Sequence, residues 1–201
     1  MAGRVIAVEP DERMRAVLAA RSAGVDVLPG RGEAIPLPNA TADAVFVSSA
    51  WHWLDPGLAV PEIARVLRYS GRLAVLSTNM DRPIPWLRAD EWFGRDEHEV
   101  VSRAAAERAQ AEGDPLLVIL PDESPFDNIE THTFRFNRVM TVPDLLDWLG
   151  TYSWVITASD QAKATGRERT AAALAEKFPG ATRIDVPMRS RCWRADRMPR
   201  P

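Results

Sequence analysis

The 201-residue sequence contains a single cysteine, Cys192. One cysteine excludes an internal disulfide and a metal site built on clustered cysteines, and it fits a reducing compartment. No stretch reaches the ~20 apolar residues of a membrane helix, and the opening residues MAGRVIAVEP lack the pattern of a secretory signal peptide. The sequence therefore predicts a cytoplasmic protein with no membrane partner and no metal.

The sequence also lacks a large excess of either charge, because 25 basic and 28 acidic residues give a formal net charge of -3. This balance gives no overall attraction to phosphate backbones, so we predict no nucleic-acid partner. The local exception is Arg189, Arg191 and Arg194, which we interpret as the solvated face of an edge strand. With 46% hydrophobic residues, the chain is long enough to bury one core, which predicts a single domain over 1–201.

Strand patterns alternate with helical patterns through the first 77 residues. The predicted strands are residues 5–8, 25–28, 44–47 and 72–77. Met14, Val17 and Leu18 follow the first strand at helical spacing, and a second helix opens at Asp55 and ends at Gly71. Strands that alternate with helices predict an α/β fold with a mainly parallel sheet.

The second half of the chain begins with a looser pattern over residues 79–127, which we interpret as a cap on the substrate side. A strand is predicted at 131–136 and a helix from Thr141, with Asp144 in capping-box position. A further helix is predicted at 167–178, and the last strand, at 188–193, is expected to pair antiparallel.

Glu9 stands directly after the first predicted strand and at the start of a helix. Nucleotide-binding α/β folds place a carboxylate at this position, where it accepts two hydrogen bonds from ribose hydroxyls. A solvated acid beside a helix N-terminus would have the same sequence pattern. Glu9 alone leaves both interpretations open.

Residues 30–47 read GRGEAIPLPNATADAVFV. This segment resembles the class I S-adenosylmethionine-dependent methyltransferases of the quinone-pathway and trans-aconitate type, whose pattern is roughly G-D-A-E-x-L-P-x-x-D-x-S-F-D-x-V. The resemblance implies that Arg31, Gly32 and Glu33 border the adenine of S-adenosylmethionine. Arg31 replaces the family's aspartate, and Glu33 has the alternative role of bracing its loop through backbone N–H groups.

Residues 47–56, VSSAWHWLDP, are similar to the same family at the carboxyl end of its fourth strand. The resemblance implies a loop beside the methionine part of the cofactor and the methyl acceptor. Its cofactor-binding candidates are Ser48, Ser49, Ala50 and Trp51. His52 is the catalytic candidate, because an imidazole can accept a proton from a hydroxyl or amine. Either neighbouring tryptophan could face the sulfonium cation. In the alternative both tryptophans are core residues and His52 orients the loop, and we interpret Trp53 as a core residue.

Residues 62–77, EIARVLRYSGRLAVLS, resemble the family's E-x-x-R-V-L-K-P-G-G-R-L segment. Tyr69 and Ser70 replace its Pro-Gly, and Gly71 remains for a turn that needs positive φ. We expect these residues to be structural. The family's Rossmann-like sheet has the strand order 3-2-1-4-5-7-6, with an antiparallel C-terminal strand.

The glycine-rich motif G-x-G-x-G, which ends the family's first strand, does not occur in this sequence. Without that central strand its two neighbours would lie about 9–10 Å apart, twice the usual spacing, and could not pair. We therefore expect a truncated sheet and a natural polypeptide that starts further upstream.

The predicted function is S-adenosylmethionine-dependent methyl transfer to a small molecule, impaired by loss of the glycine-rich loop. The alternative is a non-catalytic methyltransferase-like remnant that acts as a binding module, with self-association through an exposed sheet edge. A nicotinamide-dependent oxidoreductase would share the carboxylate at Glu9, but not the segments at 30–47 and 47–56.

Overall fold

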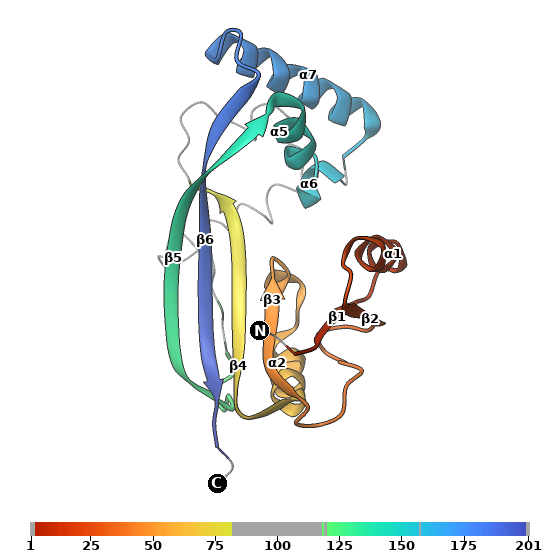
Figure 1. The fold of residues 1–201 in the computed structure, drawn as a ribbon, viewed down its shortest axis with the longest axis vertical. Helices are drawn as coiled ribbons and strands as arrows, with labels where there is room; N and C mark the ends of the chain where they lie inside the picture. Colours follow the sequence, from red (N-terminus) through yellow and green to blue (C-terminus); the bar gives the residue numbers. More distant parts are fainter. Residues whose placement is uncertain (1–2, 82–117, 119, 157, 200–201) are drawn as a thin grey trace. The chain divides into compact units, whose positions relative to one another are not determined.

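A computed structural model of the chain describes residues 3–81, 118, 120–156 and 158–199 (Figure 1). These residues divide between two compact units. Unit 1 is drawn from 1–77, 118–132 and 191–201, and unit 2 from 78–117 and 133–190. Of the cap predicted over 79–127, residues 82–117 and 119 lie outside the described part.

Unit 1 begins with strand β1 (Val5–Glu9), helix α1 (Glu12–Arg21) and strand β2 (Val25–Pro29). The two strands pair in parallel, with Val5 opposite Val25. Asp11 caps α1 by accepting a hydrogen bond from the backbone N–H of Met14 at 2.9 Å. Gly24, with φ +81°, makes the turn into β2, because glycine adopts this conformation without a Cβ penalty.

Strand β3 (Ala42–Ser48), the short 3₁₀ helix η1 (Trp51–Trp53), helix α2 (Pro56–Val66) and strand β4 (Leu67–Met80) follow. β3 and β4 are parallel, with Ala44 opposite Arg72 and Ser48 opposite Leu76. The side chains that α2 buries are Ala59, Val60, Ile63, Ala64 and Val66. This stripe contributes to the core of unit 1, together with Leu73 and Val75 of β4.

The connection from α2 to β4 corrects two predictions. The helix ends at Val66 rather than continuing to Gly71, because Leu67 already has an extended backbone with ψ 145°. The positive φ belongs to Ser70, at +61°, and not to Gly71, and Ser70 lies inside β4 where its pairing with β3 shifts register. Gly71 is required for space, since a Cβ atom there would lie 2.8 Å from the carbonyl oxygen of Arg68.

Strands β5 (Phe126–Thr141) and β6 (Arg183–Arg197) complete a four-stranded sheet with the order β3-β4-β6-β5. The arrows in Figure 1 show β6 antiparallel to both neighbours, which confirms the antiparallel C-terminal strand. The edge-strand interpretation of the arginines is wrong, because β6 lies between β4 and β5. Arg194 instead pairs across the sheet with Glu130 at 2.6 Å.

Unit 2 packs helices α5 (Val142–Leu149), α6 (Ser153–Ile156) and α7 (Asp160–Lys177) with parts of the long strands. The predicted helix start is confirmed, since Thr141 caps α5 by accepting from the N–H of Asp144, and its hydroxyl donates to the Asp144 carboxylate. The core cluster of this unit consists of Met80, Met140, Leu145, Leu146, Leu149, Leu174, Ile184, Val186 and Met188.

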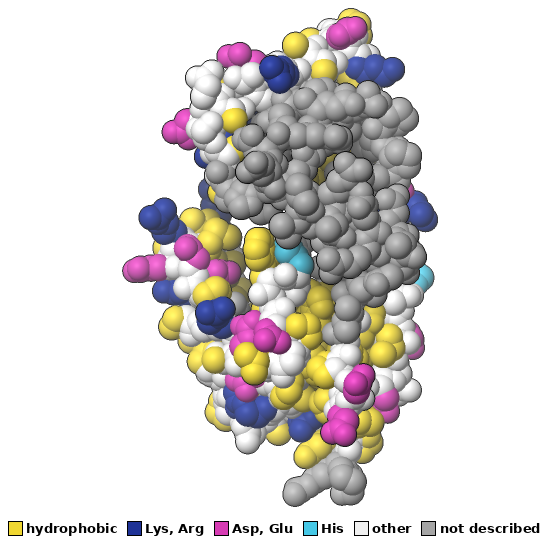
Figure 2. Space-filling model, turned by 180° about the vertical axis from the view of Figure 1, so that it is seen from behind, with side chains coloured by type: hydrophobic (Ala, Val, Ile, Leu, Met, Phe, Trp, Pro, Cys, Tyr) yellow, Lys and Arg dark blue, Asp and Glu magenta, His cyan; other side chains and the backbone are white. Residues whose placement is uncertain are grey.

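The strands of unit 1 belong to two separate sheets. Among the described residues β1 pairs only with β2, and β3 pairs with β4 in the other sheet. The expectation that the strands on either side of the family's first strand do not pair is therefore confirmed for β1 and β3. Hydrophobic side chains are exposed among charged ones on the surface (Figure 2), and they include Val5, Met14, Val17 and Phe46.

Candidate functional site

Glu9 is the last residue of β1, and its side chain is half-buried at the start of α1. Its Oε1 accepts a hydrogen bond from the backbone N–H of Asp11 at 2.9 Å. Arg15 donates from α1 to the carbonyl oxygens of Glu9 and Pro10, at 3.0 and 2.6 Å. The carboxylate is thus held at the strand-to-helix turn predicted from the sequence.

Residues 30–34 form a tight turn after β2, closed by an antiparallel bridge between Arg31 and Ala34. Gly30 packs closely on β1, because a Cβ atom there would lie 2.9 Å from Cγ1 of Val8. Gly32 similarly approaches Leu54, at 2.8 Å from a Cβ atom to Cδ2. A Cβ atom at either position would therefore force the neighbouring side chains to shift.

Glu33 braces this turn against the segment that follows β3. Its Oε1 accepts from the backbone N–H of Asp55 at 3.0 Å, and its side chain is 15% exposed. Arg31 lies 3.7 Å from the other carboxylate oxygen and points into solvent, with 72% of its side chain exposed. The geometry corresponds to the bracing role considered for Glu33, while contact with adenine stays a prediction for Arg31, Gly32 and Glu33.

A second carboxylate, Glu62 of α2, fixes the proline-rich loop at 35–39. Glu62 accepts from the backbone N–H of Ile35 at 2.7 Å and from Arg65 at 2.7 Å. Arg65 also donates to the carbonyl oxygens of Ile35 and Leu37. The hydrogen bond with Arg65 holds the pKa of Glu62 below its usual value, and the same contact raises the pKa of Arg65. The expected structural role of this segment agrees with these contacts.

The loop after β3 starts with an unusual backbone conformation. Ser49 has φ +52°, which costs a non-glycine residue on the order of 1 kcal/mol. Its N–H donates to the carbonyl oxygen of Leu76 at 2.8 Å and so extends the pairing of β3 with β4. Ser48 and Ser49 are exposed, Ala50 is half-buried, and Trp51 is 7% exposed in the core.

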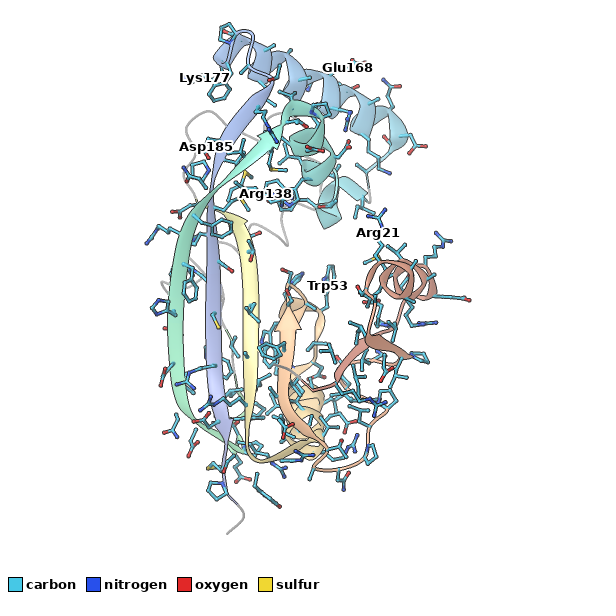
Figure 3. The ribbon with its side chains drawn as sticks, in the orientation of Figure 1. Arg21, Trp53, Arg138, Glu168, Lys177 and Asp185 are labelled. Carbon is cyan, nitrogen blue, oxygen red and sulfur yellow. The ribbon has the colours of Figure 1, made fainter. Side chains whose placement is uncertain are left out.

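His52 and Trp53 lie outside the core, at the end of this loop. Their ring centroids are 4.8 Å apart with a 44° angle between the planes. Partial desolvation lowers the pKa of His52, which favours the neutral imidazole. Trp53 is 66% exposed, so the interpretation of Trp53 as a core residue is wrong. Figure 3 shows it at the carboxyl end of β3.

Three comparisons with known proteins agree with this geometry. The family model of the methyltransferase domain matches residues 1–75. An uncharacterized methyltransferase of Mycobacterium tuberculosis (strain H37Rv) is 35% identical over 174 residues, which cover 85% of this chain and 64% of the relative. These matches make the chain similar to class I methyltransferases over its first 75 residues and over most of its length.

Two further relatives extend this result. An uncharacterized methyltransferase-like protein of Schizosaccharomyces pombe is 26% identical over 79% of this chain and 59% of its own length. The solved structure of a candidate type II methyltransferase from Anaeromyxobacter dehalogenans has a TM-score of 0.64 and 22% identity, and covers 98% of this chain and 82% of that one. The latter supports the Rossmann-like fold. The chain spans 64% of the length of the mycobacterial relative.

The methyltransferase segments singled out in the sequence meet at the turn of residues 30–34. Gly30 contacts Val8, next to Glu9, at one end of the turn. Glu33 is bonded to Asp55, just beyond the loop that carries His52, at the other end. The turn thus contacts β1 near its carboxyl end and the N-cap of α2, which follows the His52 loop. The binding and catalytic roles of these residues stay predictions.

Sequence reasoning missed the exposure of Trp53, although a signal was present. A 3₁₀ helix has three residues per turn, so residues two positions apart point in clearly different directions. Trp51 and Trp53 stand at this spacing in η1, and only one of them could enter the same core. Recognising η1 as a short 3₁₀ turn would have separated their roles.

Neither a metal-binding group nor a membrane-spanning helix is found among the described residues. No group of three or more His, Cys, Asp or Glu side chains among them is arranged to hold a metal ion. Likewise, none of the described helices is both long and apolar enough to cross a bilayer. Cys192 is a half-buried residue of β6 with a free thiol.

Proposed function

We propose that this protein transfers the methyl group of S-adenosylmethionine to a small molecule. The proposal rests on the 30–34 turn. Through Gly30 this turn contacts the carboxyl end of β1, and through Glu33 it binds Asp55, just after the His52 loop. Ligands of open α/β sheets bind beyond the carboxyl ends of the strands. Both segments occupy such ends in unit 1.

The residues present fit part of this cofactor. The Glu9 carboxylate is an acceptor suited to the two ribose hydroxyls, and it already accepts one backbone N–H. The turn at Arg31, Gly32 and Glu33 offers backbone groups to the adenine edge. Ser48, Ser49, Ala50 and Trp51 would border the methionine part. Because the sequence contains no G-x-G-x-G motif, we propose that cofactor binding and activity are impaired in this 201-residue chain.

The chemistry requires little of the protein beyond alignment and a proton acceptor. S-adenosylmethionine, when bound, supplies a methyl group on a positively charged sulfur. We propose that His52 takes the proton released by a hydroxyl or amine acceptor, because its lowered pKa keeps the imidazole neutral near pH 7. As pH falls through this pKa, the protonated fraction rises and the reaction should slow.

Calorimetric titration of the chain with S-adenosylmethionine and S-adenosylhomocysteine tests cofactor binding. Glu9→Gln should weaken the affinity about tenfold or more, because a charged acceptor at two hydroxyls is lost. Glu12→Gln, in the first turn of α1, is the matched control and should bind normally. A longer form of the protein, where the gene encodes one in frame, should bind more tightly. If neither the 201-residue chain nor a longer form binds the cofactor, the enzymatic proposal is contradicted.

The role of His52 is tested with the best-binding form and a methyl acceptor found by screening. His52→Asn should reduce kcat by about 10²–10⁴-fold while leaving cofactor affinity unchanged. Asparagine keeps the size and a hydrogen-bonding group but cannot accept the proton. An unchanged kcat and pH profile would exclude His52 as the base.

A second candidate function is a binding module that uses the open edge of β3. Within the described residues β3 pairs only with β4, and Phe46 on this strand is 71% exposed. An exposed apolar edge is a template for strand addition, and we propose self-association there for the isolated chain. Sedimentation over a concentration series should show dimers, which Phe46→Lys abolishes and Ile129→Lys, on β5, retains. A monomer at all concentrations would contradict this.

We also propose a cytoplasmic location. The free thiol of Cys192 is compatible with a reducing compartment. Fractionation of cells that express a tagged chain tests this, and recovery in an exported or membrane fraction would contradict it.

A further inference from the structure

Trp53 carries a large exposed ring that the fold itself does not use. Its neighbour Trp51 is 7% exposed, whereas Trp53 is 66% exposed. Burying a side chain of this size normally contributes on the order of 1.5–3 kcal/mol. A tryptophan left in solvent beside a predicted reaction site therefore suggests a ligand that covers it.

The segment that carries Trp53 is held on both sides. Before it, Ser49 donates to Leu76, and Trp51 anchors η1 in the core. After it, the backbone N–H of Asp55 donates to Glu33, and the Asp55 carboxylate caps α2 at Gly57. A backbone held in this way reduces the conformational freedom that binding at Trp53 would cost.

The chemistry of the loop restricts what could bind. Residues 48–54, SSAWHWL, contain no Asp, Glu, Lys or Arg. The two carboxylates next to the loop, Glu33 and Asp55, already accept backbone N–H groups. The loop thus offers an aromatic face and an imidazole, but no Lys or Arg side chain to pair with an anionic acceptor.

We propose that Trp53 is the stacking surface for the methyl acceptor and that this acceptor is a planar aromatic molecule without negative charge that carries a hydroxyl or N–H group. The His52 ring, 4.8 Å from that of Trp53, places a nitrogen base at the edge of the surface. This inference rests on the proposed methyl transfer. In that reaction the new bond forms between methyl carbon and acceptor heteroatom, the carbon–sulfur electron pair returns to sulfur, and the acceptor proton passes to His52.

The test measures binding rather than turnover. The full chain is titrated with 1-naphthol as the planar probe and with decahydro-1-naphthol as its saturated analogue, followed by calorimetry or ligand-observed NMR. 1-Naphthol should bind at least several-fold more tightly than the saturated analogue. Trp53→Ala should weaken its binding about tenfold, and Trp53→Phe should retain most of it.

Phe136→Ala is the control, because Phe136 is an exposed aromatic residue of β5, and it should leave 1-naphthol binding unchanged. Circular dichroism verifies that each variant is folded. Equal binding to wild type and Trp53→Ala, or equal affinity for both probes, would overturn the inference. S-Adenosylhomocysteine is titrated into the same samples, so that failure of cofactor binding is recorded separately from failure of acceptor stacking.

Discussion

The first two strand–helix–strand segments of the chain follow the same local pattern but differ in burial. Both α1 and α2 start at an aspartate whose side chain accepts a backbone N–H, at 2.9 Å for Asp11 and 2.8 Å for Asp55. Both segments pair their strands in parallel. Yet α1 buries no residue, while α2 buries five of eleven.

The difference shows that local signals specify a helix without specifying how firmly it is held. The α1 sequence ERMRAVLAAR leaves Met14 and Val17 more than half exposed. The α2 sequence places Ile63 and Val66 in the core of unit 1 at 0–1% exposure. Since most helix stability in proteins comes from packing, the β1-α1-β2 segment should contribute much less to the cooperative stability of the chain.

The largest expected effect is that of shortening a buried side chain in α2. Ile63→Ala should lower the free energy of unfolding by about 2–5 kcal/mol, because it removes apolar contacts and leaves a cavity. Val17→Ala in α1 should change it by less than about 0.5 kcal/mol. Urea denaturation of the two variants measures both values. Similar losses would mean that α1 is packed in solution.

Removing the two helix caps separates local from global stability. Asp55→Ala should reduce the free energy of unfolding by about 1 kcal/mol. Asp11→Ala removes an equivalent hydrogen bond, but its effect should appear as faster amide hydrogen exchange within α1 and not in the global transition. Equal shifts of the denaturation midpoint would contradict the division between the two segments.

The sequence predicted these local features because each depends on a few neighbouring residues. The caps at Asp55 and Thr141 and the apolar strand before Ser77 were all legible. β6 was not, and its 15 residues were predicted as six. Its buried positions are even-numbered at Ile184 and Val186 but odd-numbered at Trp193 and Ala195, so no single period-two pattern runs along it.

The candidate site likewise has one part that the sequence predicted and one part that it did not. Motif resemblance selected Glu9, the 30–34 turn and the loop to His52, and the structure connects them through Gly30 and Glu33. The exposure of Trp53 could not be derived from the motif, because it depends on which residues of η1 contact the core. Trp53 was therefore misassigned, and the clamp of Glu62 on the backbone of Ile35 was invisible without the fold.

The residues at positive φ near the start of each second strand allow a reciprocal exchange, since Gly24 precedes β2 and Ser70 lies in the first part of β4. The first segment has Gly24 at φ +81°, whereas the second has Ser70 at φ +61°. Ser70→Gly should stabilise the chain by about 0.5–1 kcal/mol, because glycine adopts positive φ without the steric cost that serine incurs. Thermal denaturation measures this shift. Gly24→Ser should be destabilising only locally, and a destabilised Ser70→Gly variant would show that the hydroxyl has another role.

The smallest effect is electrostatic and belongs to the second segment alone. Glu62 accepts from Arg65 and from the backbone of Ile35, and its pKa is lowered chiefly by Arg65. A group with a lowered folded-state pKa stabilises the protein above its unfolded pKa, about 4.3 for glutamate, and loses this contribution as pH falls through the folded value. Glu62→Gln should therefore cost about 0.5 kcal/mol at pH 7, because solvent screens the pair, and progressively less below pH 4.

Denaturation curves of wild type and Glu62→Gln between pH 7 and pH 3 measure this convergence. Glu168→Gln, on the exposed face of α7, is the control and should show no pH-dependent difference from wild type. A gap between wild type and Glu62→Gln that stays constant as pH falls would mean that shape rather than charge holds the 35–39 loop. If the two stabilities converge as pH falls, the ionised Glu62 carboxylate holds the 35–39 loop on α2. Among the described residues, no glutamate of α1 forms an equivalent contact.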